Sequence, residues 1–271
     1  MHSPTNTISN KDVKIAYQIL GEESEQTPLV MVVGLSGVKE DWRNLSINLS
    51  KQRQVIVIDN RGLGESDIPD GPYSVETMAT DVLAVMDHLN LPKVDCLGHS
   101  MGGMISQQLA IQSPGRIRKL ILIGTSHGGP NQAPMKVESA QAFQVDPKAS
   151  KFEKASKVLT ANFSPEWIAN NPEDYKEIVT GSLKQRRSGR GIFHQMSAVM
   201  SVNHEEKLPQ LNMPTLVIHG TKDLLLDYKN GQMLAEKIPD AQLVTLENIG
   251  HLTWSMDEGA TEKAIEKFLM A

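Results

Sequence analysis

Short apolar runs recur along this chain of 271 residues and constrain its fold more than any other feature. Five of them are nearly continuous: Pro28 to Gly34, Gln54 to Asp59, Lys93 to Gly98, Lys119 to Thr125 and Thr215 to Gly220. Such runs are typical of strands buried on both faces of a parallel sheet. Lys11 to Leu20 instead alternates between apolar and polar residues, which predicts a half-exposed edge strand.

Helical patterns lie between many of the predicted strands. The apolar residues from Val75 to Leu89 recur at steps of three and four, which predicts an amphipathic helix. Strands alternating with helices predict an α/β fold with a doubly wound, mostly parallel sheet. The alternation stops between residues 126 and 210, where no apolar strand run occurs. We therefore expect a core formed by residues 1–125 and 211–271, with residues 126–210 inserted as a helical cap, or lid.

Two helix starts are predicted inside the inserted segment. Ser164 and Asn171 each precede a proline, and a capping residue before proline at the first helical position is typical of a helix N-terminus. These signals support a helical cap rather than additional strands.

Gly98-His99-Ser100-Met101-Gly102 is the motif with the most chemical content. It is a G-x-S-x-G pattern between a predicted strand and a predicted helix, the arrangement that raises a nucleophilic serine above a sheet edge. The free N–H groups at the helix N-terminus favour negative charge developing beside Ser100. We therefore predict that Ser100 is a nucleophile.

A serine nucleophile needs a base, and the base needs an orienting acid. In open α/β sheets, such groups come from loops at the carboxyl ends of the strands. That rule selects His251, after the strand Gln242 to Glu247, as the base, and Asp223 rather than Asp227 as the acid. His99 is adjacent to the serine only in sequence. Two further histidines follow strands and are left as possible rim residues, namely His127 and His219.

At this point the chain resembles the α/β-hydrolase fold superfamily, in its serine esterase and lactonase-like branch. The matching motifs cover roughly residues 12–125 and 210–270. They are Gly34-Leu35-Ser36-Gly37 with Trp42, the stretch from Asp59 to Asp67, the serine motif, His219-Gly220-Thr221-Lys222-Asp223, and Gly250-His251. Serine at position 100, where the dehalogenase and epoxide hydrolase branches carry aspartate, argues against those branches.

The resemblance implies a role for each matched position. Ser100, Asp223 and His251 would form the catalytic triad, in that order along the chain. The backbone N–H groups of Met101 and Leu35 would form the oxyanion hole. Many relatives carry His-Gly at the start of the oxyanion loop, whereas this chain has Val33-Gly34. The Asp59 to Asp67 stretch resembles a structural turn.

Several apolar residues are candidates to contact substrate. Our predicted set is Met104, Phe163, Trp167, Phe193, Met196 and Trp254, with Leu35, Met101, Phe143, Phe152 and Met200 as further candidates. Together they favour a small, uncharged, partly apolar substrate.

Composition excludes several other classes of protein. The net charge of −5 does not suit a nucleic-acid binder, and we interpret the basic stretch from Lys184 to Arg190 as a solvated helix end and loop. No apolar run is long enough for a membrane span, and the polar N-terminus does not resemble a signal peptide. The single cysteine, Cys96, excludes an internal disulfide. We expect a cytoplasmic protein.

The sequence thus predicts a serine hydrolase that cleaves a small carboxylic ester or lactone through an acyl-enzyme, without a metal ion or organic cofactor. Two alternatives remain open. The same triad supports carbon–carbon bond hydrolysis or cofactor-free perhydrolysis, and some proteins use this scaffold as a non-catalytic ligand receptor. The sequence does not predict the oligomeric state.

Overall fold

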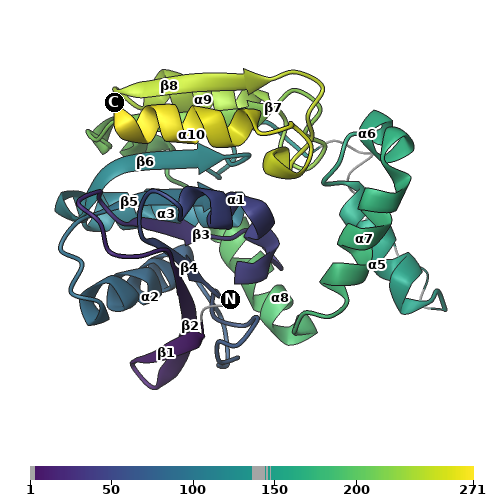
Figure 1. Ribbon diagram of the computed structural model, residues 1–271, viewed down its shortest axis with the longest axis horizontal. Coiled ribbons are helices and arrows are strands. Elements are labelled where there is room, and N and C mark those ends of the chain that lie inside the picture. The colour runs from purple at the N-terminus through teal and green to yellow at the C-terminus, as the bar shows by residue number, and fades with distance from the viewer. Residues whose placement is uncertain (1–3, 136–143, 145, 147) are drawn as a thin grey trace.

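The computed structural model describes residues 4–135, 144, 146 and 148–271. Within this part of the chain, eight strands form one sheet in the order β1-β2-β4-β3-β5-β6-β7-β8 (Figure 1). The strands are β1 (Thr5–Asn10), β2 (Val13–Leu20), β3 (Leu29–Val32), β4 (Val55–Ile58), β5 (Val94–His99), β6 (Ile117–Ile123), β7 (Thr215–Gly220) and β8 (Ala241–Leu246).

The sheet is parallel from β4 through β8, whereas β1 and β2 are antiparallel additions at one edge. Strands β3, β4, β5 and β7 are buried at every position, as their continuous apolar runs predict. Strand β1 is not predicted by the sequence. Its residues are polar because it is an edge strand, and only Ile8, which pairs with Ile15, is buried.

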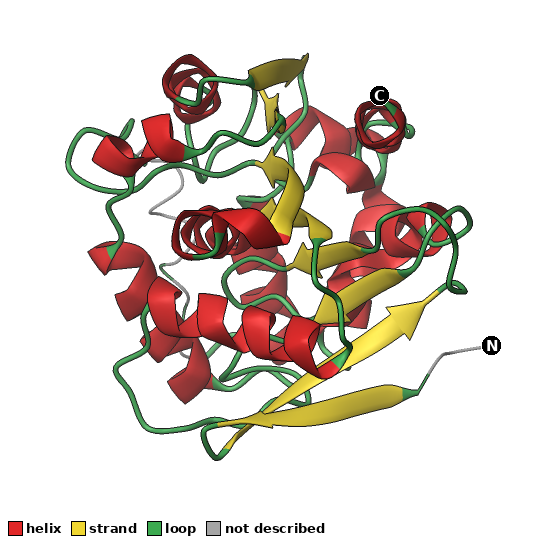
Figure 2. Cartoon of the chain, turned by 90° about the vertical axis from the view of Figure 1, so that its left-hand side faces the viewer, coloured by secondary structure: helices red, strands yellow, loops and turns green. Residues whose placement is uncertain are grey.

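Helices cover both faces of the sheet (Figure 2). One face packs against α2 (Val75–His88), α3 (Met101–Gln112) and α9 (Lys229–Lys237), and the other against α1 (Arg43–Leu49) and α10 (Ala260–Met270). The predicted helix after Ser74 is α2, and the Ser74 side chain accepts the Thr77 N–H at 3.2 Å. This doubly wound α/β arrangement agrees with the predicted fold class.

The segment between β6 and β7 is helical, as its sequence pattern predicts. It contains α5 (Lys151–Thr160), α6 (Pro165–Asn170), α7 (Pro172–Ser182) and α8 (Gly189–Ser201). The two Pro-initiated helices are α6 and α7, with Ser164 and Asn171 as their N-cap residues. In Figure 1, α5, α6 and α7 lie beyond the arrowheads of the parallel strands, at the carboxyl edge of the sheet. None of the helices described is long and apolar enough to cross a membrane.

Candidate active site

Ser100 occupies a strained turn between β5 and α3. Its φ of 55° and ψ of −123° are rare for a residue with a side chain, and such strain persists only where the surroundings hold it. The Ser100 N–H donates to the Ile123 carbonyl at 3.0 Å, and the Thr125 hydroxyl donates to the Ser100 carbonyl at 2.7 Å. A Cβ on Gly102 would lie 1.9 Å from the Val32 carbonyl oxygen, so only glycine fits where α3 crosses β3.

His251 and Asp223 meet although they lie in loops after different strands. The Nδ1 atom of His251 lies 2.7 Å from Oδ2 of Asp223, and both side chains are buried. The backbone of the His251 loop is held by the inserted segment, because the N–H groups of His251 and Leu252 both donate to the Asn162 carbonyl. The structure therefore brings together the predicted base and the predicted acid at the carboxyl edge of the sheet.

The environment of Asp223 keeps its carboxylate charged. Burial alone would raise the pKa of Asp223, but the neighbouring imidazoles of His251 and His219 outweigh burial and hold that pKa well below its usual range. The other carboxylate oxygen accepts the N–H groups of Leu225 and Leu226, each at 2.9 Å. A fixed, ionised acid of this kind can orient the Nδ1–H tautomer of His251 and stabilise its imidazolium form.

His99 lies beside the base, which its position in the sequence does not predict. Its Nε2 atom is 3.2 Å from the His251 carbonyl oxygen, and the two rings lie 4.5 Å apart. Burial, together with the neighbouring His251, lowers the pKa of His99 well below its ordinary value, so the ring is neutral. Because a carbonyl only accepts hydrogen bonds, the proton of His99 lies on Nε2.

The predicted oxyanion loop, residues 34–37, passes against Ser100. A Cβ on Gly34 would lie 2.9 Å from Cβ of Ser100, and the Gly37 N–H donates to the Gly34 carbonyl at 3.1 Å. The backbone N–H groups of Leu35 and Met101 donate no hydrogen bond to any residue described. Met101 is the first residue of α3, where an N–H has no acceptor within the helix. Both groups are thus available to a ligand.

A cavity of about 200 Å3 contains these groups. Its lining includes Ser100, His251 and three of the predicted substrate contacts, Met104, Met196 and Trp254. The remaining lining is largely apolar and comes partly from the inserted helices, through Val158, Leu159, Ile178 and Val199.

Two of the further candidates, Leu35 and Met101, also line the cavity, whereas the remaining predicted substrate contacts lie elsewhere. Phe163 is fully buried inside the inserted segment, where its ring stacks on Trp167 at 5.0 Å. Phe193 is 67% exposed, and Met200 and Phe152 are also exposed. None of these residues lines the cavity, because the aromatic rings of the segment pack on one another or face outward. Phe143 lies outside the described residues.

The cavity also contains a charged pair that the sequence does not predict. Arg187, in the basic stretch interpreted as a solvated loop, donates two hydrogen bonds from Nη2 to the Asp41 carboxylate, at 2.8 and 2.9 Å. Both residues line the cavity and are only partly exposed. Since Arg187 and Asp41 are far apart in the chain, no local pattern indicates the pair. Among the described residues, no group of three or more His, Cys, Asp or Glu side chains is arranged to hold a metal ion.

The chain is similar to known proteins of one family. A family model described as alpha/beta hydrolase fold matches residues 27–254. The curated protein 3-oxoadipate enol-lactonase 2 of Acinetobacter baylyi is 29% identical over 246 residues, covering 89% of this chain and 88% of the relative.

A second curated relative, from Stutzerimonas stutzeri, bears the provisional name carbamate hydrolase RutD. It is 28% identical over 244 residues, a match that covers 87% of this chain and 89% of the relative. Among solved structures, the enol-lactonase from Burkholderia xenovorans LB400 superposes with a TM-score of 0.84 at 26% identity, covering 98% of this chain and all of that one.

Proposed function

This chain belongs to the α/β-hydrolase fold family, and we propose that it hydrolyses a small, partly apolar carboxylic ester or lactone through an acyl-enzyme on Ser100. One observation carries the proposal. Ser100 in its strained turn and His251 line one cavity, and His251 is joined at 2.7 Å to the buried Asp223 behind it. The enol-lactonase activity named for two relatives supports the substrate class.

Acylation begins with attack of the Ser100 hydroxyl oxygen on the carbonyl carbon. Nε2 of His251 takes the hydroxyl proton, while Asp223 holds the ring through Nδ1–H and stabilises the imidazolium. The carbonyl oxygen becomes an oxyanion that the backbone N–H groups of Met101 and Leu35 stabilise, and the N-terminus of α3 favours the same charge. His251 then protonates the leaving oxygen, which departs as an alcohol from an ester or stays tethered as a hydroxyl or enol from a lactone.

Water then hydrolyses the acyl-enzyme. His251 takes a proton from the water, whose oxygen attacks the acyl carbon, and the same two N–H groups stabilise the second oxyanion. Collapse of this intermediate expels the Ser100 oxygen, which takes back its proton from His251. The products are a carboxylic acid and the free enzyme.

The shape of the cavity limits the acyl group. A volume of about 200 Å3 lined largely by methionine and aliphatic side chains suits a short acyl chain or a small ring. A carbamate presents the same carbonyl geometry, and one relative bears a carbamate hydrolase name, so carbamates are the second candidate class.

Two measurements test the proposal. A fluorophosphonate probe should label the wild-type protein at Ser100 and should fail to label Ser100→Ala. A panel of p-nitrophenyl esters of increasing chain length, small lactones and aryl carbamates should then rank the substrate classes by kcat/KM. Equal labelling of another serine in wild type and Ser100→Ala would contradict the mechanism. A carbamate at the top of the ranking would replace the substrate class and keep the triad.

A further inference from the structure

Ser36, in the oxyanion loop, is held at both backbone polar groups by side chains of the inserted segment. Its N–H donates to Oε1 of Gln195 at 3.2 Å, and Nη1 of Arg187 donates to its carbonyl oxygen. Its φ is 61°, in the left-handed region that a residue with a side chain adopts only at a cost. Two restraints from another part of the chain therefore meet on one strained residue.

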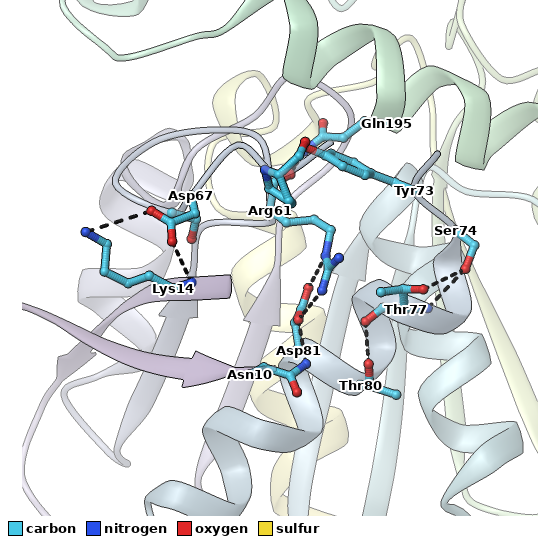
Figure 3. Close-up of polar contacts among 12 residues, drawn as sticks. Asn10, Lys14, Arg61, Asp67, Tyr73, Ser74, Thr77, Thr80, Asp81 and Gln195 are labelled. Atoms are coloured by element: carbon cyan, nitrogen blue, oxygen red, sulfur yellow. Dashed lines mark hydrogen bonds and ion pairs between the residues drawn. The ribbon is translucent and has the colours of Figure 1, made fainter. Parts of the chain in front are cut away.

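Gln195 is itself fixed by the turn after β4. It is fully buried on α8, and its Nε2 donates to the Arg61 carbonyl at 2.9 Å. The Arg61 side chain is locked in turn by a bidentate pair with Asp81, at 2.6 and 2.7 Å. Figure 3 shows Gln195 reaching from α8 toward Arg61, with Tyr73 beside them and Asp81 below. The amide of Gln195 thus links this turn to the oxyanion loop.

Arg187 is fixed by contacts on both of its sides. Its second guanidinium nitrogen bonds both carboxylate oxygens of Asp41, and Asp41 also accepts the Val38 N–H at 2.9 Å. The adjacent backbone is clamped to the β4 turn through a bridge between Leu63 and Arg187. A neighbouring glycine, Gly191, packs so closely there that an added Cβ would lie 2.0 Å from the Gly62 carbonyl oxygen.

We propose that Gln195 and Arg187 are positioning residues that hold the Leu35 N–H in its orientation for the oxyanion. Because a peptide unit is planar, the direction of the Leu35 N–H is set by the Gly34 carbonyl, which bonds the Gly37 N–H within the same turn. The left-handed Ser36 lies at the centre of that turn. Without its two restraints, Ser36 relaxes toward negative φ, and the turn that aims Leu35 is lost.

This inference rests on the proposed function and gives the inserted segment a part in the chemistry as well as in forming the cavity. It also accounts for Gln195, a buried polar side chain on α8 that satisfies both ends of its amide with backbone groups of the core. One oxyanion-hole donor is worth about 100- to 1000-fold in kcat. A change that leaves the Leu35 N–H in place but less precisely oriented should lower kcat by about 10- to 100-fold.

The first test replaces Gln195 by methionine, which keeps the volume and removes both hydrogen bonds. We expect Gln195→Met to lower kcat for a p-nitrophenyl ester and the rate of Ser100 labelling by a fluorophosphonate together, by about 10- to 100-fold, with little change in KM. The pH at which kcat/KM falls on the acid side should not move, since the His251–Asp223 pair is untouched.

Gln107→Met is the matched control. Gln107 is also a fully buried glutamine on a helix, and its amide donates to the Ser126 carbonyl at 3.0 Å rather than to the oxyanion loop. Gln107 makes one such hydrogen bond where Gln195 makes two, so the control should lose some thermal stability but keep kcat. Arg187→Lys retains the charge but replaces the two guanidinium nitrogens, which bond Ser36 and Asp41 separately, with a single ammonium nitrogen, so it should lower kcat in the same way.

Rescue distinguishes positioning from general damage. Glycine adopts positive φ without strain, so Ser36→Gly in the Gln195→Met background should restore at least one third of the lost kcat on a logarithmic scale. Wild-type kcat in Gln195→Met, or no recovery with Ser36→Gly, would overturn this inference while leaving the triad intact. Failure of the wild-type protein to be labelled at Ser100 would instead overturn the proposed function, and this inference with it.

Discussion

Nε2 of His219 lies 3.2 Å from the same Asp223 oxygen that bonds His251. The same nitrogen lies 2.9 Å from the Leu226 carbonyl oxygen. The N–H of His219 is therefore shared between the Asp223 carboxylate and the backbone of the loop that contains Asp223. A Cβ on Gly231 would lie 2.7 Å from Nδ1 of His219, so this helix glycine makes room for the ring. Asp223 therefore has two imidazole neighbours, His251 and His219.

We expect His219→Leu to lower kcat/KM by about tenfold, because the Asp223 carboxylate loses one of its donors, and a hydrogen bond to a charged group is worth about 1.5–3 kcal/mol. Without that donor, Asp223 is held less firmly and orients the His251 ring less precisely. His219→Gln, which keeps a donor, should retain most of the activity. Wild-type kcat/KM in His219→Leu would contradict this role.

Asp223 and Asp227 lie in the same loop but differ in their contacts. Asp223→Asn should lower kcat by about 10⁴-fold, by analogy with the serine-protease triad, because the amide holds His251 in the wrong tautomer. Asp227 accepts the Lys229 N–H at 3.0 Å at the start of α9, and its carboxylate is not among the groups lining the cavity. Asp227→Asn should therefore change kcat less than threefold in steady-state ester hydrolysis. The reverse order would reassign the acid.

Met196 and Phe193 lie one turn apart on α8, yet only Met196 lines the cavity. Met196→Ala should shift the ratio of kcat/KM between long-chain and short-chain p-nitrophenyl esters by about 1–3 kcal/mol, because it enlarges the cavity. Phe193→Ala removes an exposed ring and should leave that ratio unchanged. A wild-type substrate ranking in both variants would show that α8 does not contribute to specificity.

His204 predicts an acid-dependent loss of stability. Burial, reinforced by nearby Lys207, lowers the pKa of His204 to about 4. Its Nε2 bonds Gln108 at 3.0 Å, whereas Nδ1 is buried with no partner among the described residues. An unfolded histidine titrates near pH 6.5, so between about pH 6.5 and 4 the unfolded state binds more protons, and the free energy of unfolding falls as pH is lowered.

The loss should reach about 3 kcal/mol at pH 4, since each pKa unit corresponds to about 1.4 kcal/mol. Urea unfolding of wild type and His204→Gln at pH 7 and pH 4 measures it, and the variant should show a smaller pH dependence. His88→Gln, an exposed position on α2, is the control and should behave like wild type. Equal pH dependence in wild type and His204→Gln would exclude His204 as the source.

The strand–helix order and the candidate triad follow from the sequence alone because both depend on local patterns. Apolar runs predict buried parallel strands, and the loops after β5, β7 and β8 must open at one edge of a parallel sheet. Ser100, Asp223 and His251 could therefore be selected from positions in sequence. Polar edge strand β1 was beyond this reasoning, because its pairing with β2, rather than its own pattern, makes it a strand.

Only the tertiary structure decides how the inserted segment meets the core. Gln195 contacts Ser36 across 159 positions of sequence, and Arg187 contacts Asp41 across 146. Helix periodicity indicates which face of α8 is apolar, but its packing against the β4 turn determines which polar side chain reaches the oxyanion loop. Packing also decides that Met196 lines the cavity whereas Phe163 is buried among its neighbours. Side-chain contacts between distant segments depend on packing, which no local pattern encodes.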